Sequence, residues 1–269
     1  MLYICIPAYN EAATIGVLIW RIRKVFQNYS REYEILVYDD GSTDGTSETA
    51  APYADVAPVT IIRGEGRKGY AAALDVLARE ANRRTRYPRR DAMVVMQGDF
   101  TDQPEHLPEL IKRFEGGADI VLAERTSSAE PVAVTRLRKL APWAIRFAVG
   151  VGGITDPFAA FRLYRLSIVR ELAKASPDKP LITTDGWAAN VEFLFGAMPL
   201  ARRVERVSLA SRYDLRVRQS RIRPFADSLA LYRFGRAFRG RRISLPVQVA
   251  PSEKGPRQRG FKRPEQVTS

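Results

Sequence analysis

The first half of the chain alternates between two hydrophobic periods. Short apolar runs are typical of buried strands, whereas apolar residues recurring every three or four positions are typical of amphipathic helices. The segment 11–27 has the helical spacing. Its apolar residues would share one helix face, and they are Ile15, Leu18, Ile19, Ile22 and Phe26. The same reading, continued along the chain, predicts a regular succession of strands and helices.

The expected strands are Leu2–Pro7, Glu34–Tyr38, Val59–Ile62, Ala92–Met96 and Ile120–Ala123. The expected helices between them are Glu11–Gln27, Thr43–Ala51 with Ser42 or Thr43 as its cap, Gly69–Asn82 and Pro104–Phe114. Strand followed by helix, repeated, predicts an α/β fold with a parallel sheet covered by helices on both faces.

Polar residues follow three of these strands where each strand ends. The clusters are Pro7-Ala8-Tyr9-Asn10-Glu11, Asp39-Asp40-Gly41-Ser42 and Gln97-Gly98-Asp99. Ligands of parallel sheets bind outside the carboxyl ends of the strands, and parallel strands end at one edge. We therefore expect the three clusters to lie together. Taken alone, the second cluster could equally be a turn and a helix cap.

The second half is less regular. It predicts a helix over Thr135–Val149, a loop entering a strand over Asp156–Arg165, a helix over Asp185–Leu194, a strand over Arg203–Ser211 and a basic amphipathic helix over Arg223–Arg242. We expect residues 1–222 to form one domain, with a nucleotide-binding half to about residue 125 and an acceptor half over 126–222. The amphipathic helix would occupy 223–245, and a disordered basic tail 246–269.

Size and composition restrict the possibilities. The 269 residues are 45% hydrophobic, which is enough for a substantial core. The sequence contains no run of 18 apolar residues, so we expect no membrane-spanning helix. The opening MLYICIPAYN resembles a first strand and lacks the features of a signal peptide. Cys5, the single cysteine, has no partner for an intrachain disulfide, so we expect a reducing cytoplasm.

Charge predicts an anionic partner. The chain has 43 Lys and Arg against 30 Asp and Glu, a net charge of +13, and arginines are dense over residues 202–242. A nucleic acid, a lipid surface or a phosphorylated substrate would each fit, as would a merely solvated basic surface. No nucleic-acid-binding motif is present, and acidic strand ends would repel a phosphate backbone, so we expect no nucleic acid partner.

Several segments, in order, resemble the family-2 glycosyltransferases, and among them the dolichyl- and polyprenyl-phosphate sugar synthases. They are IPAYNEAATI, EILVYDDGSTDGT, GRKGYAAAL, VVMQGDFTDQPEHLPEL, ADIVLAER, DPFAAFRLYR and RYDLRVRQSR, which span roughly residues 2–222. The resemblance implies a GT-A fold and an inverting enzyme that moves a sugar from GDP-mannose or a UDP-sugar onto a lipid phosphate.

The resemblance also implies a nucleotide-sugar site. Its expected residues are Pro7, Ala8, Tyr9, Glu11, Asp39, Asp40, Lys68, Gln97, Gly98 and Asp99. Backbone around Tyr9 would close over the base. Asp39 or Asp40 would accept hydrogen bonds from the base or ribose, and Glu11 would bind a ribose hydroxyl.

A divalent cation is expected beneath the leaving diphosphate. Mg²⁺ or Mn²⁺ needs few protein ligands there, since phosphate oxygens and water complete the octahedron. The relatives have an acid, any residue, an acid and then a glutamine two positions on. Here Gln97 stands at the first acid, Asp99 at the second and Thr101 at the glutamine position, with Asp102 as a possible substitute ligand. Gln97 could instead hydrogen-bond the ribose or the donor sugar.

A lipid phosphate is already an anion, so it needs positioning rather than a general base. The resemblance assigns phosphate binding to Arg125, Arg162, Arg216, Ser220 and Arg221. Of these, Arg125 and Arg216 are also expected to be catalytic, together with Asp99. The relatives' last motif has a glycine where Arg218 stands and a lysine where Arg221 stands. His106, the single histidine, is expected to be structural or exposed.

Two alternatives to this reaction remain open. A hydroxyl acceptor would need a base, for which Asp185 is the candidate, with Glu192 as a second option that more plausibly packs or pairs structurally. The loss of one acid at Gln97 would also fit an inactive relative. For a lipid acceptor, residues 223–242 have the pattern of an interfacial helix on anionic lipid, which predicts peripheral attachment to the inner face of the membrane.

Overall fold

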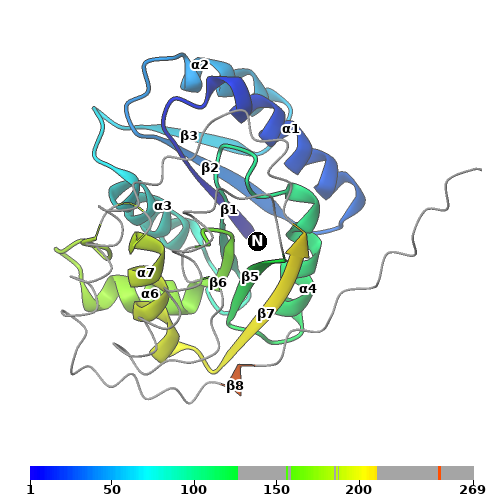
Figure 1. Cartoon of the computed structure of the whole chain (residues 1–269), viewed down its shortest axis with the longest axis vertical. Coiled ribbons are helices and arrows are strands. Elements are labelled where there is room, and N and C mark those ends of the chain that lie inside the picture. The colour runs from blue at the N-terminus through cyan, green and yellow to red at the C-terminus, as the bar shows by residue number, and fades with distance from the viewer. Residues whose placement is uncertain (127–155, 157–158, 185, 187, 211–247, 250–269) are drawn as a thin grey trace, which may run out of the picture.

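The computed structural model describes residues 1–126, 156, 159–184, 186, 188–210 and 248–249 (Figure 1). Its strands are β1 Leu2–Ala8, β2 Tyr33–Asp39, β3 Val59–Arg63, β4 Ala92–Val95, β5 Ile120–Thr126, β6 Arg162–Arg165, β7 Arg203–Ala210 and β8 Gln248–Val249. Its α-helices are α1 Ala12–Asn28, α2 Thr46–Ala50, α3 Tyr70–Arg84, α4 Leu107–Glu115, α6 Leu166–Ala175 and α7 Ala188–Ala197. Short 3₁₀ turns are η1 Ala51–Asp55, η2 Pro104–His106 and η3 Met198–Leu200.

The described strands form one sheet in the order β3-β2-β1-β4-β6-β5-β7-β8. All neighbours are parallel except β6, which runs antiparallel to both β4 and β5. The predicted α/β fold with a mostly parallel sheet is therefore confirmed. Since β6 reverses between two strands of the same direction, β5 ends at the same edge as β4.

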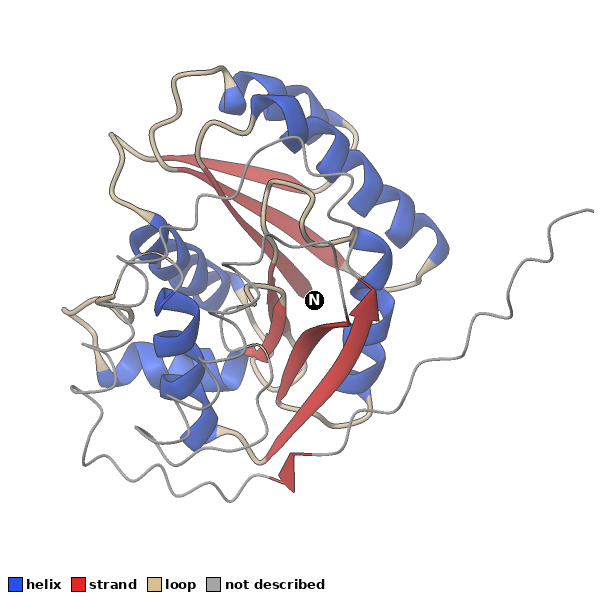
Figure 2. Ribbon diagram, viewed as in Figure 1, coloured by secondary structure: helices blue, strands red, loops and turns tan. Residues whose placement is uncertain are grey.

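Helices cover both faces of this sheet, with α3, α6 and α7 on one side and α1 and α4 on the other (Figures 1 and 2). Alternation along β1 supplies both cores. Tyr3 and Cys5 pack with α3 in one buried cluster, and Leu2, Ile4 and Ile6 pack with α1 in the other. This period of two is why the strand is apolar throughout. No helix among the described residues is long and apolar enough to cross a bilayer.

The elements differ from the expected ones in four places. The helix expected from Thr43 begins at Thr46, and its N-cap is Gly45 rather than Ser42 or Thr43. The helix expected from Asp185 begins at Ala188. Helix α6 was not predicted. Residues 248–249, inside the expected disordered tail, form β8 beside β7.

Other predicted features lie outside the described residues. They are the helix over 135–149, the basic helix over 223–242 and the tail beyond residue 249. The division into domains therefore stays a prediction.

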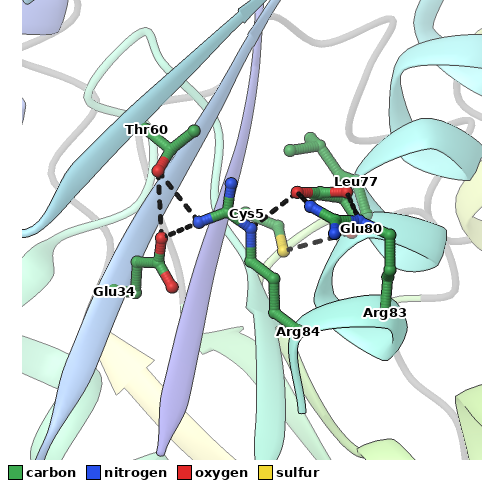
Figure 3. A network of polar contacts seen from close by, with 7 residues as sticks. All are labelled: Cys5, Glu34, Thr60, Leu77, Glu80, Arg83 and Arg84. Atoms are coloured by element: carbon green, nitrogen blue, oxygen red, sulfur yellow. Dashed lines mark hydrogen bonds and ion pairs between the residues drawn. The ribbon is translucent and has the colours of Figure 1, made fainter.

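A polar clamp attaches α3 to the neighbouring strands (Figure 3). Arg84 donates hydrogen bonds to Glu34 on β2 and Thr60 on β3, the latter at 3.0 Å. Its Nε lies 2.6 Å from Glu80, which also accepts two bonds from Arg83. Hydrogen bonds from Arg83 and Arg84 hold the pKa of Glu80 at about 2, below its ordinary 4.5.

We expect Glu80→Gln to destabilise the protein by about 1–2 kcal/mol at pH 7, after allowance for solvent screening. Because the folded pKa is the lower one, this contribution is complete above pH 4.5 and disappears as the pH falls toward 2. Urea unfolding at pH 7 and pH 3 measures it. Glu32→Gln, at an exposed side chain, is the control. A Glu80→Gln deficit of equal size at both pH values would contradict the prediction.

Candidate active site

The three polar clusters lie at one edge of the sheet. β1 lies between β2 and β4 and is parallel to both, with Ala8 opposite Asp39 and Cys5 opposite Val95. The strands therefore deliver residues 7–11, 39–47 and 97–103 to neighbouring positions. The loop 64–69, between β3 and α3, joins them there.

Asp39 fixes the turn after β2. Its side chain is fully buried, and Oδ1 accepts the Ser42 backbone N–H at 2.8 Å. The Ser47 hydroxyl donates to Oδ2. A buried carboxylate is stable only when such donors replace its water. The sequence allowed this segment to be a turn followed by a helix cap. The turn is present, but the N-cap of α2 is Gly45.

Asp40 connects this turn to α3. Its carboxylate is 4% exposed. Oδ1 accepts the Lys68 N–H and Oδ2 accepts the Gly69 N–H, both at 2.8 Å. One buried side chain therefore fixes the backbone that leads into α3.

Gly41 allows the two loops to touch. It has φ +72°, and a Cβ there would lie 2.7 Å from the Gly66 carbonyl carbon and 2.8 Å from the Arg67 nitrogen. Both atoms belong to the backbone, so neither can move aside without displacing the loop. Only glycine combines this conformation with this approach.

The loop after β1 is attached to the loop after β2. Asn10, at φ +52°, donates its backbone N–H to Ser42 Oγ at 2.8 Å and accepts the Thr43 N–H at 2.9 Å. Glu11 donates its N–H to Thr46 Oγ1 at 2.8 Å. Two of the loops are therefore one hydrogen-bonded unit.

Arg67 adds a contact that the sequence did not predict. Its guanidinium lies over the ring of Tyr9, 4.3 Å from the centroid. The pair joins the loop after β1 to the loop before α3. It places a cation against one face of an aromatic ring at this edge. Tyr9 and Arg67 lie in separate loops, and nothing in the sequence pattern indicated that their side chains would be in contact.

The loop after β4 holds the predicted metal ligands. Asp102 accepts the Gln97 N–H at 3.0 Å, and Asp99 accepts the Thr101 N–H at 3.0 Å. Phe100 has φ +61°, a rare conformation for a bulky residue that often marks a functional site. A Cβ on Gly98 would lie 3.4 Å from Glu11 Cγ, so this loop borders the first.

Two oxygens in this loop are buried without a hydrogen-bond donor among the described residues. They are Gln97 Oε1 and Thr101 Oγ1. Such atoms are uncommon in folded proteins and call for a partner. These two oxygens and the Asp99 carboxylate belong to the same loop, and all three are of the chemical type that Mg²⁺ or Mn²⁺ accepts as ligands. Within the described ranges, no group of three or more His, Cys, Asp or Glu side chains could hold a metal, so the set is poor in acids.

The chain matches the family described as "Glycosyl transferase family 2" over residues 3–173, which is more than half of its 269 residues. The chain belongs to this family. It is therefore a glycosyltransferase, as the sequence motifs predicted.

Curated relatives of this family-2 glycosyltransferase are similar at modest identity. It is 27% identical over 209 residues to an undecaprenyl-phosphate mannosyltransferase of Micrococcus luteus, covering 76% of this chain and 80% of the relative. It is 35% identical over 122 residues to a dolichol-phosphate mannosyltransferase of Pyrococcus furiosus, covering 45% of this chain. The chain spans only 32% of that archaeal relative. A dodecaprenyl-phosphate galacturonate synthase of Rhizobium johnstonii is 24% identical over 177 residues, covering 64% of this chain and 49% of the relative.

Solved structures show the fold. Glucosyl-3-phosphoglycerate synthase of Mycobacterium tuberculosis, crystallised with Mn²⁺, UDP and phosphoglyceric acid, has a TM-score of 0.60 at 21% identity, covering 91% of this chain and 79% of that one. A structure of the same enzyme with Mg²⁺ and UDP has a TM-score of 0.61 at 21% identity, covering 91% and 80%. The predicted GT-A fold is confirmed.

Arg162 of this glycosyltransferase is buried. It is 1% exposed at the start of β6, opposite Val95. Its guanidinium donates to the Asn190 carbonyl at 2.6 Å and to the Asp156 carbonyl at 3.2 Å. Tyr70 donates to the Asn190 side chain at 2.8 Å. Arg162 thus joins β6 to α7 through these carbonyl contacts, and the phosphate-binding role expected for it stays a prediction.

Glu192 is structural, which confirms the interpretation preferred for it. Oε2 accepts the backbone N–H groups of Thr183 at 3.0 Å and Thr184 at 2.7 Å, and Oε1 accepts the Thr183 hydroxyl at 2.8 Å. These bonds fix the chain just before residue 185. His106 lies in η2, and burial lowers its pKa. The structural role expected for it agrees with that partial burial.

The remaining predicted residues are placed only in part. Arg125 is the second-last residue of β5, opposite Leu209 in register. Its backbone therefore lies at the edge where β4 ends. Asp185, Arg216, Ser220 and Arg221 lie outside the described residues. Lys68 is exposed beside the loop that Asp40 fixes, and Pro7 and Ala8 end β1.

We expect Gly41→Ala to lower stability by about 1–3 kcal/mol, because the new methyl group meets backbone and the φ is strained. Gly66→Ala is a matched control in the facing loop, since nothing lies within 4 Å of its added Cβ. Thermal unfolding of both variants measures the difference. Equal melting temperatures would show that the two loops do not approach as described.

Proposed function

We propose that this glycosyltransferase transfers a sugar from a nucleotide-sugar donor to a polyprenyl phosphate, with inversion at the anomeric carbon. The observation that carries the proposal is the meeting of the loops after β1, β2 and β4 at one edge of the sheet. Two relatives named as polyprenyl-phosphate or dolichol-phosphate mannosyltransferases support the acceptor. GDP-mannose and UDP-sugars are both candidate donors.

The loops suit a nucleotide diphosphate. Tyr9 with Arg67 offers an aromatic face and a cation at the edge of the site. Glu11 and the exposed Lys68 lie on neighbouring loops and provide an acceptor for a ribose hydroxyl and a donor for phosphate. The Asp39 and Asp40 carboxylates already accept four bonds from the protein, so their first contribution is to hold the loops for the ligand.

A divalent cation fits the loop after β4. Asp99, Gln97 and Thr101 would hold it, and the two unpartnered oxygens on Gln97 and Thr101 support that set. Crystals of a GT-A enzyme with Mn²⁺ or Mg²⁺ and UDP support divalent metal use in the fold. When bound, the cation neutralises charge on the departing diphosphate. Asp102 keeps the loop closed by accepting the Gln97 N–H.

The acceptor phosphate supplies its own nucleophile. One of its oxygens forms a bond to the anomeric carbon while the bond to the diphosphate breaks, so no proton must be removed. Arg125, at the end of β5, stands on the same edge as Asp99 and would hold the acceptor or donor phosphate. Arg216, Ser220 and Arg221 would complete the phosphate contacts.

A lipid acceptor requires contact with a membrane. We place that contact in residues 223–242, whose arginines alternate with large apolar side chains. The enzyme would then bind the inner face of the membrane peripherally. Sedimentation with phosphatidylglycerol vesicles at low salt tests this, and a protein left in the supernatant would refute the attachment.

We expect sugar transfer to a polyprenyl phosphate to require Mg²⁺ or Mn²⁺ and to fall on the order of 100-fold in kcat/KM in Asp99→Asn. The assay is formation of lipid-linked sugar from each of GDP-mannose, UDP-glucose and UDP-N-acetylglucosamine. Asp55→Asn, at an exposed side chain in η1, is the control. Turnover that survives both EDTA and Asp99→Asn would remove the cation from the proposal.

A hydroxyl acceptor is the second candidate, because Glu192 fixes the chain immediately before Asp185. A base is essential for a hydroxyl and unnecessary for a phosphate. We therefore expect Asp185→Asn to retain transfer within about tenfold if the acceptor is a lipid phosphate. A loss on the order of 1,000-fold, with sugar transferred to alcohols, would favour the hydroxyl acceptor instead.

A further inference from the structure

A cavity lies at the edge of the sheet opposite the candidate active site. It has a volume of about 600 Å³, and its lining includes Arg89, Arg165, Arg170 and Arg202. These residues belong to the segments before β4 and β7, the end of the antiparallel β6, and α6. Because the active-site loops follow the other ends of β1, β2 and β4, the two sites do not share residues.

Arg165 forms a fixed wall of this cavity. Its Nε lies 2.7 Å from Asp119 Oδ1, and its Nη2 lies 2.8 Å from the Ala118 carbonyl. The Phe114 ring supports the guanidinium at 4.4 Å from the centroid. The other oxygen of Asp119 accepts the backbone N–H groups of Arg202 and Arg203, at 2.8 and 3.3 Å. Asp119 is therefore occupied by Arg165 and by the backbone before β7.

The other three arginines, Arg89, Arg170 and Arg202, are not paired with a carboxylate in this way. Arg170 donates to two neutral acceptors, Asn82 Oδ1 at 3.0 Å and the Thr85 carbonyl at 3.3 Å. Arg89 and Arg202 are exposed. Across the part of the chain that the structure describes, no carboxylate forms an ion pair with any of the three. Glu171, the remaining acid in the lining, pairs with Lys174 at 2.9 Å.

Three uncompensated guanidiniums around one cavity raise its positive potential. Like charges held together destabilise a fold unless an anion or solvent screens them. The planar guanidinium fork matches phosphate oxygens in pairs, and Arg170 is held in place by its neutral acceptors. A volume near 600 Å³ lies in the range of small-molecule sites. A concave site of this size favours a compact ligand over an extended surface.

We propose that this cavity binds a soluble phosphate-bearing small molecule, with Arg89, Arg170 and Arg202 as its phosphate ligands. Ser167, half-buried in the lining, supplies a hydroxyl for the same oxygens. The ligand is additional to the donor and acceptor of sugar transfer, since the cavity lies at the far ends of the strands. The proposal does not depend on the proposed reaction.

Titration calorimetry of the full chain with inorganic pyrophosphate tests this. The test variant is Arg89→Gln/Arg202→Gln, whose two side chains are exposed and form no ion pair within the described part of the chain. The matched control is Lys24→Gln/Lys112→Gln, which removes the same charge from exposed positions on α1 and α4. We expect the test variant to bind at least tenfold more weakly than wild type and the control to bind within about twofold of it.

Binding that is equal in the wild type and the test variant would place the anion elsewhere, including the active site, and would overturn the proposal. Vesicles with and without phosphatidylglycerol form a second arm. If the Arg89→Gln/Arg202→Gln change abolished vesicle binding while leaving pyrophosphate affinity unchanged, the cavity would serve lipid headgroups and the soluble ligand would be wrong. Asp99→Asn is included as a third variant, because it alters only the other edge, and a loss of pyrophosphate affinity confined to it would also overturn the proposal.

Discussion

Two adjacent buried carboxylates at the end of β2 hold the candidate active site together. Burial of Asp39 and Asp40 would be costly without donors. The donors come from Ser42 and Ser47 on one side and from the backbone of Lys68 and Gly69 on the other. The same bonds that satisfy the charges therefore fix the turn after β2 and the loop before α3. The loop edge has its shape before any ligand arrives, which lowers the entropy lost on binding.

The antiparallel strand β6 joins the two halves of the molecule. It lies between β4 and β5, so the beginning of β6 meets the end of β4 at the site edge. Arg162 occupies that position and donates hydrogen bonds to the carbonyls of Asp156 and of Asn190 on α7. A buried arginine that binds backbone oxygens stabilises the position of what it touches. Arg162 therefore holds Asp156 and α7 against the start of β6, at the edge where β4 ends.

The hydrophobic periods were sufficient for most of the fold. Strand β1 and helix α1 each face a core that their spacing specifies, and the parallel order of β2, β1 and β4 follows from the helices between them. Helix α6 was missed because LYRLSIVRELAKA continues from a strand without a turn signal between them. The start of α2 was misplaced because the Ser42 hydroxyl accepts the Asn10 N–H from another loop, and the Thr46 N–H is bonded by Asp44 instead. That is a tertiary effect on a local pattern.

The sequence predicted which segments make up the candidate site. It did not predict what each side chain in those segments does. Motif spacing brought residues 7–11, 39–42 and 97–99 to one edge, because adjacency of parallel strand ends follows from topology. Motif spacing could not distinguish a carboxylate that meets a ligand from one that meets the backbone. Asp40 and Arg162 both illustrate this, since Lys68, whose N–H bonds Asp40, and Asn190, whose carbonyl bonds Arg162, are each 28 residues away along the chain.

The net charge of +13 likewise has more than one cause. Many arginines in the described part of the chain are structural: Arg21 pairs with Glu105, Arg31 with Glu115 and Arg84 with Glu34. Such pairs consume acid and base equally and leave the excess unexplained. The excess of positive charge among the described residues is concentrated in places. Part of it surrounds the cavity lined by the segments that precede β4 and β7. A basic composition therefore does not by itself indicate one extended polyanion, because an enzyme that handles phosphates at separate places accumulates the same surplus.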